Sequence, residues 1–307
     1  MTFYLRSLRP VQLRLISAVA RHGKLRLAAD SCGMTTPAAS RMLADIEAQL
    51  GADLFERTPK GMRTTPAGRM LAKHALKLVF DIDQMAQEFG AHLDGTGGAV
   101  RVGAVTGGAL AAMIPAILQL KQEAPSVDVS VDVSSSSQLM RGLEAGDYDF
   151  TLSRVGPNDY SRDFDIHPAR NEAVLLMVRG SHPMSGAETV SLSDLRDQLW
   201  TMQDRGAPIR HALEIAFHEE GVALPANLIK TASVVAIMAL LRDSDVIAVV
   251  TQEVVDLLLS PPFSADLALL KTERPIMIEP YHILRPRDRL MSAAAERLLS
   301  LLQRKLG

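Results

Sequence analysis

The chain has 307 residues, of which 47% are hydrophobic and 22% are charged. This composition is ordinary for a folded protein of two or three domains and excludes an intrinsically disordered chain. The net charge of −2 is unevenly distributed, because residues 1–75 hold twelve Lys and Arg against five Asp and Glu. These residues carry +7 and the rest −9, which predicts a polyanionic partner for the N-terminal region alone.

The sequence also indicates a compartment. Cys32 is the only cysteine, which excludes an intramolecular disulfide and favours a reducing environment. Arg6, Arg9 and Arg14 interrupt the apolar run that a signal peptide needs. The longest uncharged apolar stretch, 232–241, has ten residues and is about half a membrane span. We therefore expect a cytoplasmic protein without a membrane partner.

Three short helices are predicted near the N-terminus. The first begins near Pro10 and ends at Gly23, and the second covers 25–31. After a glycine turn, the third begins with Thr36 as its N-cap and Pro37 as its first helical residue. The residues expected to pack inward from the third helix are Ala39, Leu43, Ile46 and Leu50.

This helix-turn-helix is followed by a basic hairpin, or wing, and a surface of small residues lets the third helix enter a DNA major groove. The residues expected to contact the major groove are Thr36, Pro37, Ser40 and Arg41. Those expected to contact phosphates or the minor groove are Arg57, Lys60 and Arg63. The predicted partner is double-stranded DNA. An ion pair of Arg57 with Glu56 or another local acid is the alternative for Arg57, and a solvated turn is the alternative for the other two.

A long helix is predicted to begin at Pro66 with Thr65 as its cap. Its apolar residues recur at heptad spacing, as Leu71, Ala75, Leu78, Ile82, Met85, Phe89 and Leu93. This stripe either packs on its own domain or pairs two chains. We favour pairing, because a three-helix head has little surface to cover so long a stripe. The expected dimerisation residues are Leu71, Leu78, Ile82, Met85 and Phe89.

Beyond the glycine-rich segment 95–98 the sequence alternates between strand and helix patterns. The clearest strand is 127–133, where valines alternate with Asp and Ser. Further strands are expected at 99–105, 148–153, 173–178, 199–202, 228–232 and 246–250. This alternation predicts an α/β fold with largely parallel sheets, divided into two units.

Enzyme signatures are lacking in the sequence. Gly103, Gly107 and Gly108 follow a strand but lack the spacing of a dinucleotide- or phosphate-binding loop. His218 is followed by two glutamates without a second histidine at metal-ligand spacing. No Gly-x-Ser-x-Gly nucleophile elbow occurs. We therefore expect no enzymatic activity, no metal and no cofactor.

Five segments of the head together resemble the LysR-type transcriptional regulators. They are Ala28-Ala29, Pro37-Ala38-x-Ser40-Arg41, Ile46-Glu47-x-x-Leu50-Gly51, Leu54-Phe55-Glu56-Arg57 and Thr65-x-Ala67-Gly68. Two weaker matches follow, Leu143-x-x-Gly146-x-x-Asp149 and Gly180-x-His182-Pro183-Met184. The resemblance extends over essentially the whole chain.

The resemblance implies a winged helix-turn-helix domain at 1–65, a linker or dimerisation helix at 66–94 and an effector-binding domain at 95–307. The last would be a two-lobed α/β domain of the type 2 periplasmic-binding-protein kind, with lobe I at about 99–162 and 268–307 and lobe II at about 163–267. A homotetramer is implied, and RNA polymerase is a further candidate partner. Two positions depart from the family. Thr36 replaces the base-reading Gln common there, and Leu25 stands where an aromatic residue is common near the start of the second helix. The wing, 58–65, is similar to those of regulators of sugar-binding and sugar-uptake genes.

An effector site is predicted beyond the carboxyl ends of the body's strands, near helix N-termini. The expected residues are Thr106, Ser135, Ser136, Met202, Gln203, Ser233 and Thr251. For each serine the alternative is an N-cap. Arg154 ends a strand and either meets an anionic ligand or forms an interdomain ion pair. Hydroxyl groups suit a small polar effector such as a sugar or an organic acid, in keeping with control of uptake or catabolism genes.

Two other protein classes fit parts of the sequence. A periplasmic solute-binding protein fits the two-lobed body but not the basic head. An α/β enzyme with an appended helix fits the body but lacks a catalytic constellation.

Overall fold

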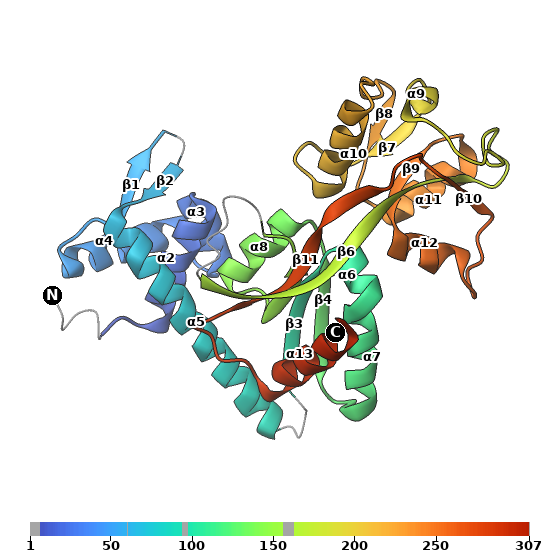
Figure 1. The fold of residues 1–307 in the computed structure, drawn as a ribbon. Helices are drawn as coiled ribbons and strands as arrows, with labels where there is room; N and C mark the ends of the chain where they lie inside the picture. The colour runs from blue at the N-terminus through green and yellow to red at the C-terminus, as the bar shows by residue number, and fades with distance from the viewer. Residues whose placement is uncertain (1–6, 60, 94–97, 156–162, 307) are drawn as a thin grey trace.

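The computed structural model describes residues 7–59, 61–93, 98–155 and 163–306. A helical head with a β-hairpin comes first, one long helix follows, and two lobes of mixed α/β structure complete the chain (Figure 1). Within these ranges no helix is both long enough and apolar enough to cross a membrane.

The head consists of three helices and a hairpin. Their bounds are α2 (Pro10–His22), α3 (Leu25–Ser31), α4 (Thr36–Leu50), β1 (Phe55–Thr58) and β2 (Gly61–Thr64). α2 and α4 each end at a glycine in the left-handed region, Gly23 with φ 60° and Gly51 with φ 63°. The inward faces of the helices, which include Ile16, Leu43 and Ile46, form one apolar core. The three predicted helices are therefore present.

The N-cap of α4 differs from the prediction. Thr35 has the extended backbone of a cap, and its Oγ1 accepts a hydrogen bond from the Ala38 backbone N at 3.4 Å. Thr36 is the first helical residue and Pro37 the second. Assigning the cap to Thr36 was wrong, because the two adjacent threonines offer the same hydroxyl and only the backbone conformation distinguishes them.

The linker helix α5 (Pro66–Leu93) packs against α2 with its first half. Leu71 and Ala75 are buried in the core of the head. At 8% exposure, Leu71 has almost no surface left for a second chain, so we remove it from the expected dimer contacts. Further along the apolar stripe, Leu78 is 49% exposed, Met85 63% and Phe89 65%, and Ile82 is partly buried.

One seven-stranded sheet joins the two lobes, in the order β10-β6-β11-β5-β3-β4 with β9 paired to β6. Its strands are β3 (Ala99–Ala104), β4 (Asp128–Val133), β5 (Phe150–Ser153), β6 (Phe164–Arg179), β9 (Ala248–Thr251), β10 (Leu267–Leu270) and β11 (Ile276–Pro286). β3 is parallel to β4 and to β5. The long strands β6 and β11 are antiparallel and run through both lobes (Figure 1).

The α/β class is confirmed, but the expectation of largely parallel sheets is wrong. β9 and β10 pair antiparallel with β6, and β11 pairs antiparallel with β5. β10 and β11 were missed in the sequence. β11 contains Glu279 and Pro280, and its register against β6 shifts between Ile278 and Tyr281, so the alternating pattern of a strand is interrupted there.

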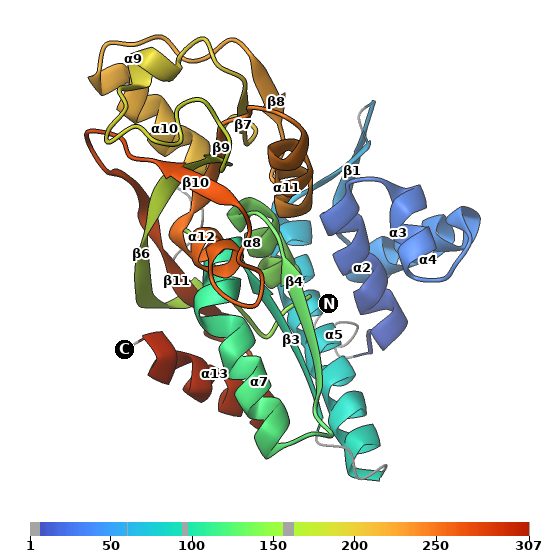
Figure 2. The same ribbon diagram turned by 90° about the vertical axis from the view of Figure 1, so that its right-hand side faces the viewer.

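Helices flank the sheet in lobe I and surround a small sheet in lobe II. Those of lobe I are α6 (Thr106–Gly108), the π-helical turn η1 (Ala109–Met113), α7 (Ile114–Glu123), α8 (Ser136–Ala145) and α13 (Ala293–Leu306). Lobe II adds α9 (Leu192–Leu195), β7 (Trp200–Met202), α10 (Pro208–Glu219), β8 (Leu228–Lys230), α11 (Val234–Asp243) and α12 (Gln252–Leu259). α7 and α13 lie side by side over β3 (Figures 1 and 2).

Each lobe has its own apolar core. In lobe II, Trp200 is fully buried, its ring centroid lies 5.6 Å from that of Phe217, and its Nε1 donates to the Leu195 carbonyl at 2.8 Å. Two separate cores joined mainly by two strands leave the lobes able to move relative to each other.

Candidate functional sites

The exposed face of α4 carries the residues expected to meet DNA. Pro37 and Arg41 are exposed, whereas Thr36 and Ser40 are partly buried. Arg57 reaches α4 from β1, and its Nη2 donates to Ser40 Oγ at 3.2 Å. The wing and α4 are thus in direct contact. Four of the seven residues expected to meet DNA lie along α4.

The second wing arginine has a local acidic partner. Arg63 Nη2 lies 2.7 Å from Glu56 Oε2, across the β1–β2 hairpin. The ion pair with Glu56 that was considered for Arg57 is therefore made by Arg63. With 74% of its side chain exposed, Arg63 remains accessible to a phosphate. Lys60 lies outside the described residues.

Backbone contacts fix the wing against the helices. The Met62 backbone N donates to the Gly23 carbonyl at 2.7 Å. A Cβ on Gly61, where φ is +133°, would lie 2.2 Å from that carbonyl oxygen. Only glycine permits so close an approach of the hairpin to the end of α2. Backbone packing therefore holds the wing against the end of α2.

In lobe I the expected effector residues follow β3 and β4. Thr106 opens α6, and Ser135 caps α8, where its Oγ and the Gln138 side chain form a capping box. Ser136 Oγ accepts a hydrogen bond from the Arg154 backbone N at 3.2 Å. The N-cap alternative is thus realised for Ser135, while Ser136 connects α8 to the end of β5.

A buried polar cluster lies where α12 of lobe II meets α6 of lobe I; we call it the interlobe cluster. It comprises Gly107, Arg154, Glu172 and Glu253, together with Thr251, which pairs with Val174 of β6, two residues from Glu172. Arg154 forms an ion pair with Glu172, and their side chains are only 8% and 2% exposed. A Cβ on Gly107 would lie 1.6 Å from Glu172 Oε1 and 3.0 Å from Glu253 Oε2, so both carboxylates face this glycine.

Several atoms of the interlobe cluster are buried without a hydrogen-bond partner among the described residues. They are the oxygens Glu172 Oε1, Glu253 Oε2 and Thr251 Oγ1, together with Arg154 Nη2, which faces Glu172 in the ion pair but without hydrogen-bond geometry. Buried polar atoms are nearly always paired, so these three oxygens are suited to hydrogen bonds from the donor groups of a ligand. Two carboxylates against one guanidinium make the cluster rich in hydrogen-bond acceptors and formally negative.

Burial is the main influence on the basic groups nearby. It lowers the pKa of Arg154, while Tyr281, Glu253 and Glu279 act in the opposite direction. Arg154 Nε also donates to the Glu279 carbonyl at 2.7 Å. Burial, followed by the charge of Arg154, lowers the pKa of His282. A neutral His282 next to a charged Arg154 follows at neutral pH.

The other expected effector residues lie elsewhere in lobe II. Met202 is 2% exposed and packs in the core of lobe II, so its side chain cannot line a polar site, and we remove it from the expected set. The Gln203 carbonyl accepts a hydrogen bond from Arg210 Nη1 at 3.2 Å. Ser233 caps α11 by accepting from the Ala236 backbone N at 3.3 Å. Of the effector residues expected in lobe II, only Thr251 lies at the interlobe cluster.

Sequence reasoning missed Glu172 and Glu253. Glu172 directly precedes the apolar run 173–178, and a charged residue at the start of a buried strand was the available signal. Arg154 was recognised with two alternatives, and the structure shows the ion pair.

Comparison with known proteins decides the family. Residues 10–69 match the description "Bacterial regulatory helix-turn-helix protein, lysR family", and residues 93–307 match "LysR substrate binding domain". The second match alone covers more than half of the chain. This chain belongs to the LysR family of transcriptional regulators. It is therefore a DNA-binding regulator with an effector-binding domain, as the sequence resemblance implied.

Among relatives of this LysR-family protein is "HTH-type transcriptional regulator GbpR" of Rhizobium radiobacter, which is 36% identical over 247 residues, or 80% of this chain and 82% of that one. The regulator of the same name from Azospirillum brasilense is 29% identical over 292 residues, or 95% of this chain and 84% of that one.

Solved structures share the fold. Full-length OxyR from Pseudomonas aeruginosa has a TM-score of 0.62 at 19% identity, with 97% of this chain and 94% of that chain covered. Full-length CbnR in complex with its target DNA has a TM-score of 0.58 at 20% identity, with 97% and 100% covered.

Proposed function

We propose that this LysR-family regulator reads a specific operator with α4 and its wing, and responds to a small polar effector held between its lobes. The division into a head at 1–65, a linker helix at 66–94 and an effector domain at 95–307 is part of the proposal. So is the absence of enzymatic activity. The contact between Arg57 and Ser40, which unites wing and reading helix, carries the DNA-binding part.

At the DNA interface the residue types assign the roles. Phosphate contacts supply affinity, and base contacts supply specificity. Arg41 is the one long cation among the α4 residues, so it is the base-reading candidate, supported by the small neighbours Thr36, Pro37 and Ser40. Arg57, Lys60 and Arg63 serve the phosphates or the minor groove. In this scheme the protein acts in the cytoplasm, and RNA polymerase is its partner at the promoter.

Replacing Arg41 should weaken operator binding far more than nonspecific binding. A bidentate arginine–base contact discriminates by about 1–3 kcal/mol, which is roughly a 5- to 150-fold change in affinity. A gel-shift titration of Arg41→Ala, on the region upstream of the protein's own gene and on a scrambled duplex, measures this ratio. Arg242→Ala, which removes an equal charge from lobe II, should leave both affinities unchanged. Equal losses on the two duplexes would place Arg41 on phosphate only.

For the effector, the interlobe cluster supports a molecule rich in hydroxyl groups. The unpaired atoms of Glu172, Glu253 and Thr251 all accept hydrogen bonds, and sugar hydroxyls donate them. An organic anion would add charge next to two carboxylates. Of the residues expected from the sequence, Thr106, Ser135, Ser136 and Thr251 remain in this proposal. Control of sugar uptake or catabolism genes fits this chemistry and the character of the wing.

The regulatory mechanism would be a population shift. An effector that touches both lobes stabilises their closed arrangement, which changes how chains pack and how far apart paired heads lie on DNA. β6 and β11, which run through both lobes, are the segments that would bend.

We further propose a homo-oligomer, dimerised along the second half of α5 and completed to a tetramer by the effector domains. The exposed apolar residues Leu78, Met85 and Phe89 support pairing along this helix, because such a stripe is otherwise left in water.

The dimer of a Met85→Lys variant should therefore dissociate more readily than the wild-type dimer. Burying an unpaired charge in an apolar helix interface costs more than about 1.4 kcal/mol, so the dimer Kd should rise at least tenfold. Sedimentation equilibrium measures it. The matched control is Met277→Lys on β11, where the methionine is 52% exposed against 63% for Met85. An unchanged Kd for Met85→Lys would show that α5 does not carry the dimer.

A further inference from the structure

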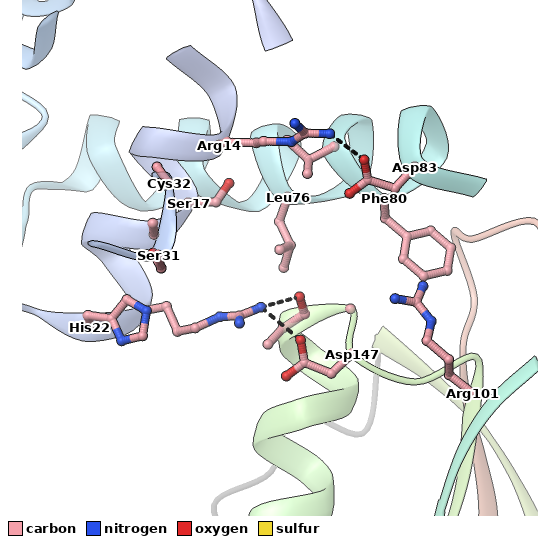
Figure 3. A pocket seen from close by; sticks show the side chains of 15 residues that line it. Arg14, Ser17, His22, Ser31, Cys32, Leu76, Phe80, Asp83, Arg101 and Asp147 are labelled. Carbon is pink, nitrogen blue, oxygen red and sulfur yellow. Dashed lines mark hydrogen bonds and ion pairs between the residues drawn. The ribbon is translucent and has the colours of Figure 1, made fainter. Parts of the chain in front are cut away.

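A cavity of about 420 Å³ lies where the head, α5 and lobe I meet, and we call it the junction cavity (Figure 3). Its walls come from α2, the end of α3, α5, β3 and the turn after α8. The ionisable side chains that line it include Arg14, Arg21, His22, Asp83, Arg101 and Asp147. It contains none of the residues assigned above to DNA or effector.

Two of its three arginines hold the head in place. Arg14 of α2 forms an ion pair with Asp83 of α5. Arg21 Nη2 donates to the Ala145 carbonyl at 2.7 Å and lies 3.2 Å from Asp147 Oδ1, at the end of α8. The cavity therefore exists only while the head is docked against lobe I, and its two sides belong to different parts of the chain.

The third arginine, Arg101 of β3, has an unused donor. Its guanidinium carbon lies 5.6 Å from the centroid of the Phe80 ring, toward which Figure 3 shows it directed. Its Nη2 is buried and, across the described ranges, has no hydrogen-bond partner. Arg289, 5.1 Å from the same ring, adds positive charge, but its nitrogens already donate to the carbonyls at the end of α8. A buried guanidinium N–H facing a cavity calls for an oxygen acceptor.

We propose that the junction cavity is a second ligand site, for a small organic molecule that carries a phosphate or carboxylate group. Three guanidinium groups against two carboxylates give the lining a net charge of +1 with His22 neutral. Arginine forks bind such oxyanions through two parallel hydrogen bonds. The volume is within the range of small-molecule sites. A ligand that touches Arg101 and the two head arginines together stabilises the docked head, so occupancy and head orientation are coupled.

The single cysteine provides a reporter for this site in the unmodified full-length protein. Cys32 lines the junction cavity and is partly buried. A bound ligand should slow its alkylation by a thiol reagent, by about tenfold at ten times the Kd. The probes are glucose 6-phosphate, citrate and glucose. Slowing by glucose 6-phosphate alone assigns a phosphate ligand, and slowing by citrate alone a carboxylate. The proposal is overturned if uncharged glucose slows the alkylation to the same extent, or if neither anion slows it.

Arg101→Met should abolish this protection, whereas Arg179→Met, which removes an exposed lobe II arginine, should retain it. Circular dichroism checks that each variant is folded, and Arg14→Met replaces Arg101→Met if the latter is not. Protection that survives in folded Arg101→Met, or in folded Arg14→Met where that variant replaces it, contradicts the site. Thiol labelling does not depend on DNA or on an interlobe effector, so this result stands or fails independently of the proposed function.

Discussion

A Gly68→Ala variant should be less stable than the wild-type chain and should lose operator binding, although the same substitution in a helix usually adds about 1 kcal/mol. A Cβ at Gly68 would lie 1.9 Å from the Leu54 carbonyl oxygen. That oxygen accepts a hydrogen bond from the Thr65 backbone N at 2.9 Å, and Thr65 Oγ1 accepts one from the Gly68 backbone N at 3.0 Å. The added methyl must push α5 away from the start of the wing.

We expect an overpacking cost of about 3 kcal/mol, at the upper end of the usual range because the obstacle is backbone rather than a flexible side chain. Chemical denaturation followed by circular dichroism measures it. Gly90→Ala is the matched control in the same helix, where nothing lies within 4 Å of the added Cβ. It should be neutral or slightly stabilising. If Gly68→Ala is as stable as Gly90→Ala, the close approach of α5 to the wing does not exist.

The head could be predicted closely from the sequence because its signals are local. α2 begins at a proline and is capped at its end by a glycine, and the spacing of apolar residues in α4 directly predicts its buried face. The one error there, the cap at Thr36 instead of Thr35, arose because adjacent identical side chains differ only in backbone conformation. Local chemistry determines the helix, but not which of two equivalent hydroxyls caps it.

The body was harder, because its sheet is built by pairing distant segments. β11 lies between β5 and β6, about 100 residues or more away in sequence, and its irregular register hides the strand pattern. Met202 was placed at the effector site because it follows a strand, but whether that end faces a ligand or a core depends on tertiary packing. Tertiary packing likewise places Thr251, which also ends a strand, at the interlobe cluster.

The junction cavity had no sequence signal at all. Arg14, Arg21 and Arg101 come from parts of the chain that meet only when the head docks on lobe I. In the sequence, Arg14 and Arg21 only add to the positive charge of the head, and Arg101 is a single charged residue within a strand. Their common environment follows from the arrangement of whole domains.

A Glu172→Gln variant should lose about 3–5 kcal/mol of effector-domain stability, because it removes the carboxylate that forms the ion pair with the buried Arg154. The ion pair is almost completely shielded from water, so solvent screening does little to reduce this cost. Chemical denaturation measures the loss, and the exposed Glu188→Gln serves as the control that removes an equal charge. The double variant Arg154→Met, Glu172→Leu should recover most of the stability, since well-packed apolar side chains can replace a buried ion pair. A single variant as stable as wild type would mean that Arg154 is solvated.

The same double variant separates stability from effector binding. If the interlobe cluster holds the effector, a thermal-shift screen of sugars and organic acids should raise the Tm of the wild-type protein for a hydroxyl-rich ligand, because a ligand stabilises the state it binds. The double variant, once its stability is shown to be recovered, lacks the acceptor oxygens of Glu172, and its Tm should not shift with that ligand. If the Tm of this stable double variant still rises with the ligand, the effector binds away from Glu172. A shift produced only by organic anions would reverse the preference for hydroxyl-rich effectors, since the two carboxylates that face Gly107 repel a further negative charge.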